Sequence, residues 1–187
     1  MKKTEENLIF ASVIFIILLM TGTGFAGQKI KKQTTGNDID SQIFTNQADK
    51  KTQQKKRFIV NNDNTVLDTR TGLMWAAEDN GTDIGWADAK KYCENYKGGG
   101  YSNWRMPNIK ELEGIDIGNL DGYMPDCSAG EWSVYITNSI ILTCCCLWAS
   151  DTLNSSAGIF NFNYGNWGWY HQANVHYVRV LPVRNKK

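Results

Sequence analysis

Every tryptophan, tyrosine and cysteine of this chain lies beyond residue 57, and this distribution confines the folded core to the C-terminal part. Residues 57–187 hold all seven Trp, all eight Tyr and all five Cys of the 187-residue sequence. A segment of that length suits one hydrophobic core but not two full domains. The sequence therefore predicts a single domain over 57–187, preceded by two shorter segments of different character.

Residues 1–26 predict export. Lys2 and Lys3 begin the chain, no charged residue occurs from Leu8 to Ala26, and small residues follow the apolar run. This pattern is typical of a signal peptide cleaved after Ala26. The alternative is an uncleaved membrane anchor, because 19 uncharged residues come close to the roughly 20 that span a bilayer. In both cases we expect the rest of the chain outside the cytoplasm, in the periplasm, at the cell surface or secreted.

Charge separates the next segment from the domain. Residues 27–56 contain seven Lys and three acidic residues, a net charge of +4, and few large apolar groups. Such a segment buries too little surface to offset its ordering entropy, so we expect a basic disordered linker. Residues 57–184 carry nine Lys and Arg against fourteen Asp and Glu, a net charge of −5. This argues against nucleic acid as a partner, and we expect membrane contact only through an uncleaved N-terminal segment.

Hydrophobic periodicity and turn residues predict strands at both ends of the domain and helices between them. Strands are expected at 58–60, 65–67 and 73–75, and later at 147–149, 158–163 and 175–183. Helical spacing predicts a helix over 86–96 that stops before Gly98. Asn108 and Glu111 have the spacing of a capping box, which predicts a second helix. The order indicates an α+β domain.

Two composite motifs occur in order along the domain. They are Asp68-x-x-Thr71-Gly72-Leu73-Met74-Trp75 and Tyr101-Ser102-x-Trp104-Arg105-x-Pro107-x-x-Lys110-Glu111-Leu112. With a later LWASDT and a closing YVRV, this string resembles the C-terminal domain family of the Legionella collagen-like adhesin, which is common in exported bacterial proteins. The resemblance covers nearly all of 57–184. It implies a C-type-lectin-like fold, with two early helices on a small, mainly antiparallel sheet with long loops.

The same resemblance implies a binding module rather than an enzyme. The adhesin's domain is associated with sulfated polysaccharide, although the lectin-like fold also occurs in formylglycine-generating enzymes. We interpret the motif residues as structural. Trp75 and Trp104 are expected to anchor the core. Arg105 is expected to form a buried or half-buried ion pair with Asp68 or Glu111.

Five cysteines in an exported domain indicate disulfides, and an odd number leaves at least one thiol free or bonded between molecules. Cys93 lies on the apolar face of the first predicted helix. Members of the family often have its partner in the last strand, but Val178-Arg179-Val180 occupies that stretch here. Cys127 and the run 144–146 remain as partners for Cys93. We favour a bond from Cys127 to one cysteine of the run, with the others buried as small apolar groups.

The sequence predicts no catalytic residue, metal site or cofactor. The run 144–146 lacks the C-x-x-C spacing of zinc sites. As a strand, it would direct Cys144 and Cys146 to one face and Cys145 to the other. No Lys, Arg or His lies near it in sequence to activate a thiol. A thiol-dependent enzyme of the formylglycine-generating type is therefore the disfavoured alternative, because that family's own motif is also missing.

Residues 161–171 form the candidate site, with five aromatic residues interleaved with Asn and Gly. Flat rings stack on the apolar faces of sugars, and amides hydrogen-bond their hydroxyls. As a loop with turns at Gly165 and Gly168, the segment would expose Trp167 and Trp169. The predicted ligand-binding residues are Asn163, Asn166, Trp167, Trp169 and Tyr170. Alternatively these aromatics cover the core beneath a short hairpin, and Phe162 belongs to the core in either case.

We therefore expect an extracytoplasmic, non-catalytic module that binds a polysaccharide or another envelope partner. A structural or assembly domain of the envelope without a small ligand is the second hypothesis.

Overall fold

We describe a computed structural model of the chain. It describes residues 57–118, 122–127 and 133–186, together with 43, 45–46 and 48–53. The predicted signal segment, 1–26, and much of the predicted linker lie outside these residues. The described linker residues have helical backbone and exposed side chains. Within the described ranges, none of the helices combines the length and the apolar character required to cross a bilayer.

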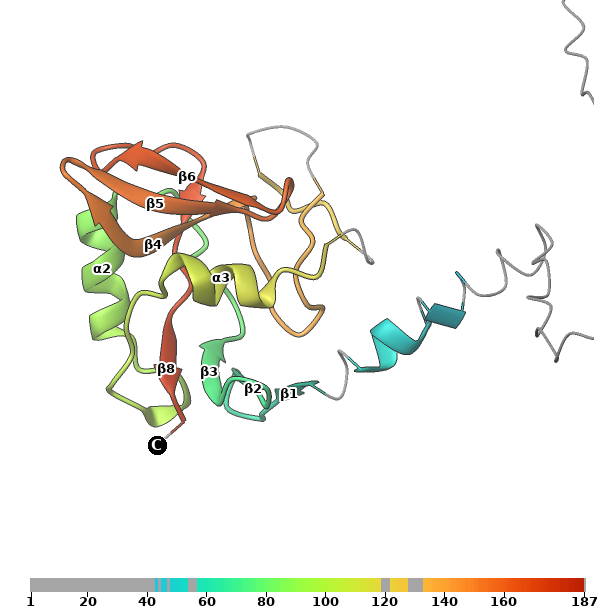
Figure 1. Cartoon of the computed structure of the whole chain (residues 1–187). Helices are drawn as coiled ribbons and strands as arrows, with labels where there is room; N and C mark the ends of the chain where they lie inside the picture. Colours follow the sequence, from blue (N-terminus) through green and yellow to red (C-terminus); the bar gives the residue numbers. More distant parts are fainter. Residues whose placement is uncertain are drawn as a thin grey trace, which may run out of the picture. The chain divides into compact units, whose positions relative to one another are not determined.

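The first sheet joins the two ends of the domain. It contains β1 (Phe58–Val60), β2 (Thr65–Asp68), β3 (Leu73–Ala76) and β8 (Val183–Asn185), in the order β1-β2-β3-β8. All three pairings are antiparallel. The strands predicted at 58–60, 65–67 and 73–75 are confirmed. This sheet lies at one end of the domain in Figure 1, close to the C-terminus.

The turn between β2 and β3 shows what the first motif does. The Asp68 carboxylate accepts hydrogen bonds from Arg57 Nε at 2.7 Å, Thr71 Oγ1 at 2.9 Å and the Arg70 N–H at 3.0 Å. Gly72, at φ +71°, donates its N–H to the Asp68 carbonyl at 2.8 Å. An aspartate at the start of a turn and a glycine in the left-handed region are the residues that this turn requires. The motif therefore encodes a turn and its clamp.

Two helices follow, α2 (Trp86–Asn95) and α3 (Ile109–Ile115), with a short 3-10 turn, η1 (Gly98–Gly100), after α2. The predicted capping box is confirmed. The Glu111 N–H donates to Asn108 Oδ1 at 2.8 Å, and the Asn108 N–H donates to Glu111 Oε2 at 2.9 Å. The Arg105 guanidinium also donates to both Glu111 oxygens, at 2.8 and 2.6 Å. Of its two predicted partners Arg105 thus pairs with Glu111, because Arg57 occupies Asp68.

The second sheet contains β4 (Cys146–Leu153), β5 (Ser156–Asn161), β6 (Asn166–His171) and β7 (Val178–Arg179), in the order β6-β5-β4-β7. The β4–β7 pairing is parallel and the other two are antiparallel. The long strand predicted over 175–183 is wrong. Only Val178 and Arg179, in β7, and Val183, in β8, are strand residues, and the two strands belong to different sheets. Pro182, which lacks an N–H, lies between them. Few helices and two mainly antiparallel sheets make this an α+β fold.

Buried apolar side chains of α2, α3 and both sheets form one hydrophobic core. Trp75, Trp148, Phe160 and Phe162 are its largest fully buried side chains. Trp104 is also buried, and its indole N–H donates to the Gly98 carbonyl at 3.1 Å. Burial of side chains of this size supplies most of the hydrophobic stabilisation of a domain this small.

Candidate functional site

The segment 161–171 is a turn followed by a strand, not the loop that the sequence predicted. Asn161 Oδ1 accepts from the N–H groups of Asn163 and Tyr164, at 2.9 and 3.3 Å, and so begins the turn. Gly165, at φ +64°, completes it. Gly168 lies inside β6, paired with Ile159 of β5, and makes no turn. Asn and Gly are common in loops, but pairing with β5 decides the structure here.

Side-chain alternation along β6 divides the predicted site residues between two faces. Residues that are paired across antiparallel strands lie on the same face, so Trp167 shares a face with Phe160 and Trp169 with Gly158. Asn166 and Tyr170 project to the opposite face. The five predicted ligand-binding residues therefore do not form one surface. Asn163, in the turn, lies on the same side of the sheet as Tyr170.

On one face of β6, Trp167 and Trp169 form an exposed pair. Their ring centroids are 5.8 Å apart with an interplanar angle of 82°, an edge-to-face arrangement. They retain 50% and 40% of their surface exposed. Two tryptophans with that much exposed surface on an edge strand form an apolar platform that is accessible to a partner.

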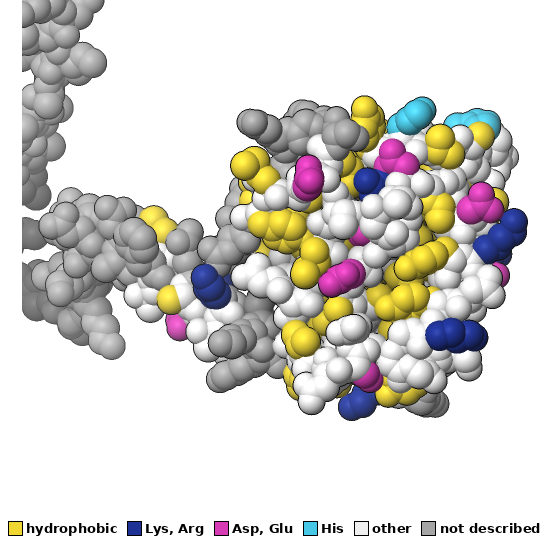
Figure 2. Space-filling model, turned by 180° about the vertical axis from the view of Figure 1, so that it is seen from behind, with side chains coloured by type: hydrophobic (Ala, Val, Ile, Leu, Met, Phe, Trp, Pro, Cys, Tyr) yellow, Lys and Arg dark blue, Asp and Glu magenta, His cyan; other side chains and the backbone are white. Residues whose placement is uncertain are grey.

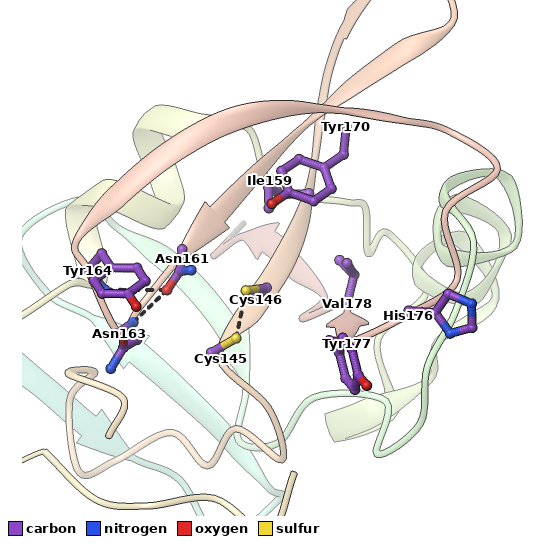
Figure 3. A pocket seen from close by; sticks show the side chains of 10 residues that line it. All are labelled: Cys145, Cys146, Ile159, Asn161, Asn163, Tyr164, Tyr170, His176, Tyr177 and Val178. Atoms are coloured by element: carbon purple, nitrogen blue, oxygen red, sulfur yellow. Dashed lines mark hydrogen bonds between the residues drawn. The ribbon is translucent and has the colours of Figure 1, made fainter. Parts of the chain in front are cut away.

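On the other face of β6 lies a pocket of about 280 Å³. Figure 3 shows Tyr164, Tyr170 and Tyr177 at separate places around the pocket, with the sulfur atoms of Cys145 and Cys146 between them; we call these two buried cysteines the floor of the pocket. Ten residues line it: Cys145, Cys146, Ile159, Asn161, Asn163, Tyr164, Tyr170, His176, Tyr177 and Val178. Among them, Tyr164, Tyr170 and Tyr177 are exposed by 63%, 47% and 44%. The pocket therefore combines accessible rings with amide groups and contains no Lys, Arg, Asp or Glu.

Asn163 contributes an unsatisfied acceptor to this pocket. Its Nδ2 donates to the Ser133 carbonyl at 2.8 Å, which fixes the orientation of the amide. Its Oδ1 is buried and has no hydrogen-bond partner among the described residues. A buried acceptor without a donor costs free energy.

Tyr177 has a strained backbone at the pocket's edge. Its φ is +61°, in the left-handed region that residues other than glycine seldom adopt. Its N–H donates to Asp83 Oδ1 at 3.0 Å, and Asp83 also pairs with the buried Arg179. Such strain costs on the order of 1–3 kcal/mol and is concentrated at functional sites. The ion pair therefore helps to hold Tyr177 in the position from which its ring lines the pocket.

The cysteines divide as the favoured interpretation expected, with a bond from Cys127 to Cys144. Cys93, Cys145 and Cys146 are free and buried. Burial raises the pKa of the Cys93 thiol. The expected alternation along 144–146 is wrong, because β4 begins only at Cys146. Instead the sulfur atoms of Cys145 and Cys146 meet at 2.7 Å (Figure 3).

The five predicted ligand-binding residues leave out four polar or aromatic residues of the pocket: Asn161, Tyr164, His176 and Tyr177. Asn161 and Tyr164 lie within the candidate segment 161–171, and Tyr177 is the first residue of the closing YVRV. The described residues contain no group of three or more His, Cys, Asp or Glu side chains placed to hold a metal ion. Figure 2 shows charges of both signs scattered over one face of the domain, with histidines at its upper edge beside hydrophobic side chains.

A family model described as the Lcl C-terminal domain matches residues 64–184. No curated protein matches the chain.

Proposed function

The chain belongs to the Lcl C-terminal domain family, and from this premise we propose that it is a non-catalytic module that binds a neutral carbohydrate outside the cytoplasm. The binding site is the pocket beneath β6. The proposal depends on one observation above all, that three accessible tyrosine rings and two amide side chains line a single pocket. The pocket's volume of about 280 Å³ lies near the lower end of the range for small-molecule pockets. This volume suits a single sugar unit of a longer chain.

Each part of the pocket matches a part of a sugar. The rings of Tyr164, Tyr170 and Tyr177 offer flat apolar faces for the C–H face of a pyranose. The amide side chains of Asn161 and Asn163 line the same pocket, and amides hydrogen-bond the hydroxyl groups of sugars. Tyrosine side chains also lose little conformational entropy on binding, since they have only two side-chain torsions.

The charges favour a neutral sugar over a sulfated one. The residues that line the pocket include no Lys or Arg. The domain as a whole carries nine basic and fourteen acidic residues between 57 and 184. Sulfate groups are recognised by charge-assisted hydrogen bonds from cations, and a negative domain disfavours a polyanion.

The Trp167–Trp169 platform supports a second candidate function, contact with an envelope protein. It lies on the opposite face of β6 from the pocket and adds two exposed indoles to an edge strand. Tryptophan is enriched at the centres of protein interfaces. In this alternative the domain serves assembly and the pocket takes no small ligand.

Adjacent residues of β6 provide a matched test. Tyr170 and Trp169 have similar exposure but face opposite sides of the strand. The purified protein is applied to an array of neutral and sulfated oligosaccharides, and affinities for the neutral hits are measured by calorimetry. We expect Tyr170→Ala to lower affinity by at least tenfold and Trp169→Ala to leave it within about twofold. Binding to sulfated glycans alone, or loss in Trp169→Ala but not in Tyr170→Ala, contradicts the proposed site.

A further inference from the structure

Two adjacent thiols at the floor of the pocket have no role in the carbohydrate site as described so far. The sulfur atoms of Cys145 and Cys146 are 2.7 Å apart, closer than two sulfur atoms that are merely packed together. Both side chains line the pocket, so a small reagent can reach them through it. Figure 3 shows the two side chains pointing toward one another, with Asn161 on one side of them and Tyr177 on the other.

A bond between adjacent cysteines differs from an ordinary disulfide. Consecutive Cα atoms are about 3.8 Å apart across a trans peptide, whereas most disulfides join Cα atoms about 4.4–6.8 Å apart. A bond between neighbours therefore strains the intervening peptide and is more easily reduced. Cys127 and Cys144, with Cα atoms 5.0 Å apart, meet the ordinary requirement. The domain thus holds one disulfide of ordinary span and one thiol pair whose bond would be labile.

We propose that Cys145 and Cys146 form a reversible vicinal disulfide that makes the floor of the pocket sensitive to redox conditions. The oxidant is a low-molecular-weight or protein disulfide. The Cys145 thiolate attacks one sulfur of that disulfide and releases a thiolate, which leaves a mixed disulfide on Cys145. The Cys146 thiol then loses its proton, and its sulfur attacks the Cys145 sulfur and releases the second thiol. Two electrons and two protons pass to the oxidant, which becomes two thiols.

The surroundings favour this order of attack. A hydrogen bond from the Cys146 thiol lowers the pKa of Cys145, against the opposing effect of burial. The same contact, together with burial, raises the pKa of Cys146. Cys145 is therefore the thiol that ionises first, and thiolates are the nucleophiles in disulfide exchange.

Closing the bond would move the walls of the pocket as well as its floor. Cys146 is paired with Asn161 of β5 and with Val178 of β7, and the Cys145 carbonyl accepts from the Phe162 N–H at 2.8 Å. A twist of the peptide between the two cysteines therefore reaches the turn that carries Asn163 and the residue next to Tyr177. The effect on sugar affinity rests on the proposed function, but the redox couple does not.

The test uses the full chain and needs no sugar. The protein is equilibrated in glutathione buffers of graded redox ratio, and free thiols are alkylated before peptide mass spectrometry. We expect the peptide that contains both cysteines to change reversibly between two forms. In one form both thiols are alkylated, and in the other neither is, and the peptide is two hydrogens lighter than the free dithiol. Cys93→Ser, a buried thiol elsewhere, is the matched control and leaves this transition unchanged. Cys145→Ser abolishes it.

Hydrogen exchange on the oxidised and reduced wild-type protein then tests the link to the pocket. We expect the exchange of the Phe162 and Val178 amides to differ at least threefold between the two forms, while amides of the first sheet stay the same. Alkylation of both thiols at every ratio in the folded protein, or a stable glutathione adduct on one cysteine, overturns the proposed couple. A couple with unchanged exchange around the pocket overturns its role there. Neither result depends on whether the pocket binds carbohydrate.

Discussion

Replacement of Asp68 by asparagine tests the clamp that the first motif encodes. The Asp68 side chain is fully buried, and Arg57, which pairs with it, is nearly so. An asparagine oxygen in place of Oδ1 can still accept from Arg57 Nε and from the Arg70 N–H. The amide nitrogen in place of Oδ2 then faces a second Arg57 donor and Thr71 Oγ1. The guanidinium nitrogen Nη2 loses its carboxylate partner and keeps only the Gly114 carbonyl, at 2.8 Å, while the charge of Arg57 stays largely buried.

That loss sets the magnitude. Breaking a buried ion pair by removing one partner costs about 3–5 kcal/mol. We expect about 3 kcal/mol for Asp68→Asn, because two of the hydrogen bonds survive. For a domain of this size the midpoint of thermal unfolding should fall by roughly 10 °C. Asp88→Asn is the matched control, since Asp88 and its partner Lys91 are both exposed, and it should change stability by less than about 0.5 kcal/mol.

The pH dependence gives the same prediction an independent check. Burial by itself would raise the pKa of Asp68, but hydrogen bonds from Arg57, Thr71 and Arg70 outweigh it, so the pKa is lowered on folding. The ionised form is therefore stabilised by the fold, and its contribution is present above the unfolded pKa of about 3.9. It is lost as the pH falls through the folded pKa. Urea unfolding at pH 7 and pH 3 should show the difference between wild type and Asp68→Asn shrinking in acid. Equal stability of Asp68→Asn and Asp88→Asn at pH 7 would refute the reasoning.

Three further variants probe the packing of the second sheet and the disulfide that precedes β4. A Cβ at Gly158 would lie 2.7 Å from Ile109 Cδ1, so Gly158→Ala should cost about 1–3 kcal/mol by overpacking. At Gly168 the nearest atom lies 3.9 Å away, so Gly168→Ala should be neutral or slightly stabilising; similar unfolding midpoints for the two variants would contradict this packing. Replacing Cys127 and Cys144 together by serine removes a bond between residues 17 apart and should cost about 3 kcal/mol in urea unfolding. An unchanged midpoint would show that the two cysteines are not bonded.

Local signals in the sequence predicted the elements that local interactions determine. The capping box at Asn108 and Glu111 fixed the start of α3, because both of its hydrogen bonds lie within four residues. The structure of residues 161–171, in contrast, depends on pairing with a strand elsewhere in the sheet. Glycine is common in turns, but Gly168 is paired with Ile159 of β5 and is therefore part of a strand. Alternation along that strand then separated Trp167 and Trp169 from Tyr170, which a loop would have allowed to act together.

The pocket could not be predicted for a related reason. Its walls come from three separate segments, 145–146, 159–170 and 176–178. The parallel pairing of β4 with β7 brings the first and third of these together, and a single sequence does not specify which strands pair. Nor does it indicate that Tyr177 adopts a left-handed backbone, since tyrosine has no preference for that region.

The motif residues and the pocket tyrosines have different physical roles, and this difference decides what a family match can explain. Asp68, Arg105 and Glu111 of the shared motifs bond to backbone or to each other and hold a turn and a helix in place. Tyr164 and Tyr170 lie outside those motifs and stay largely exposed, so replacing them removes little buried surface. The family match therefore accounts for the body of the domain, whereas under the proposed function the choice of ligand depends on side chains that can change without unfolding it. For the same reason, a loss of binding in Tyr170→Ala would report on recognition and not on stability.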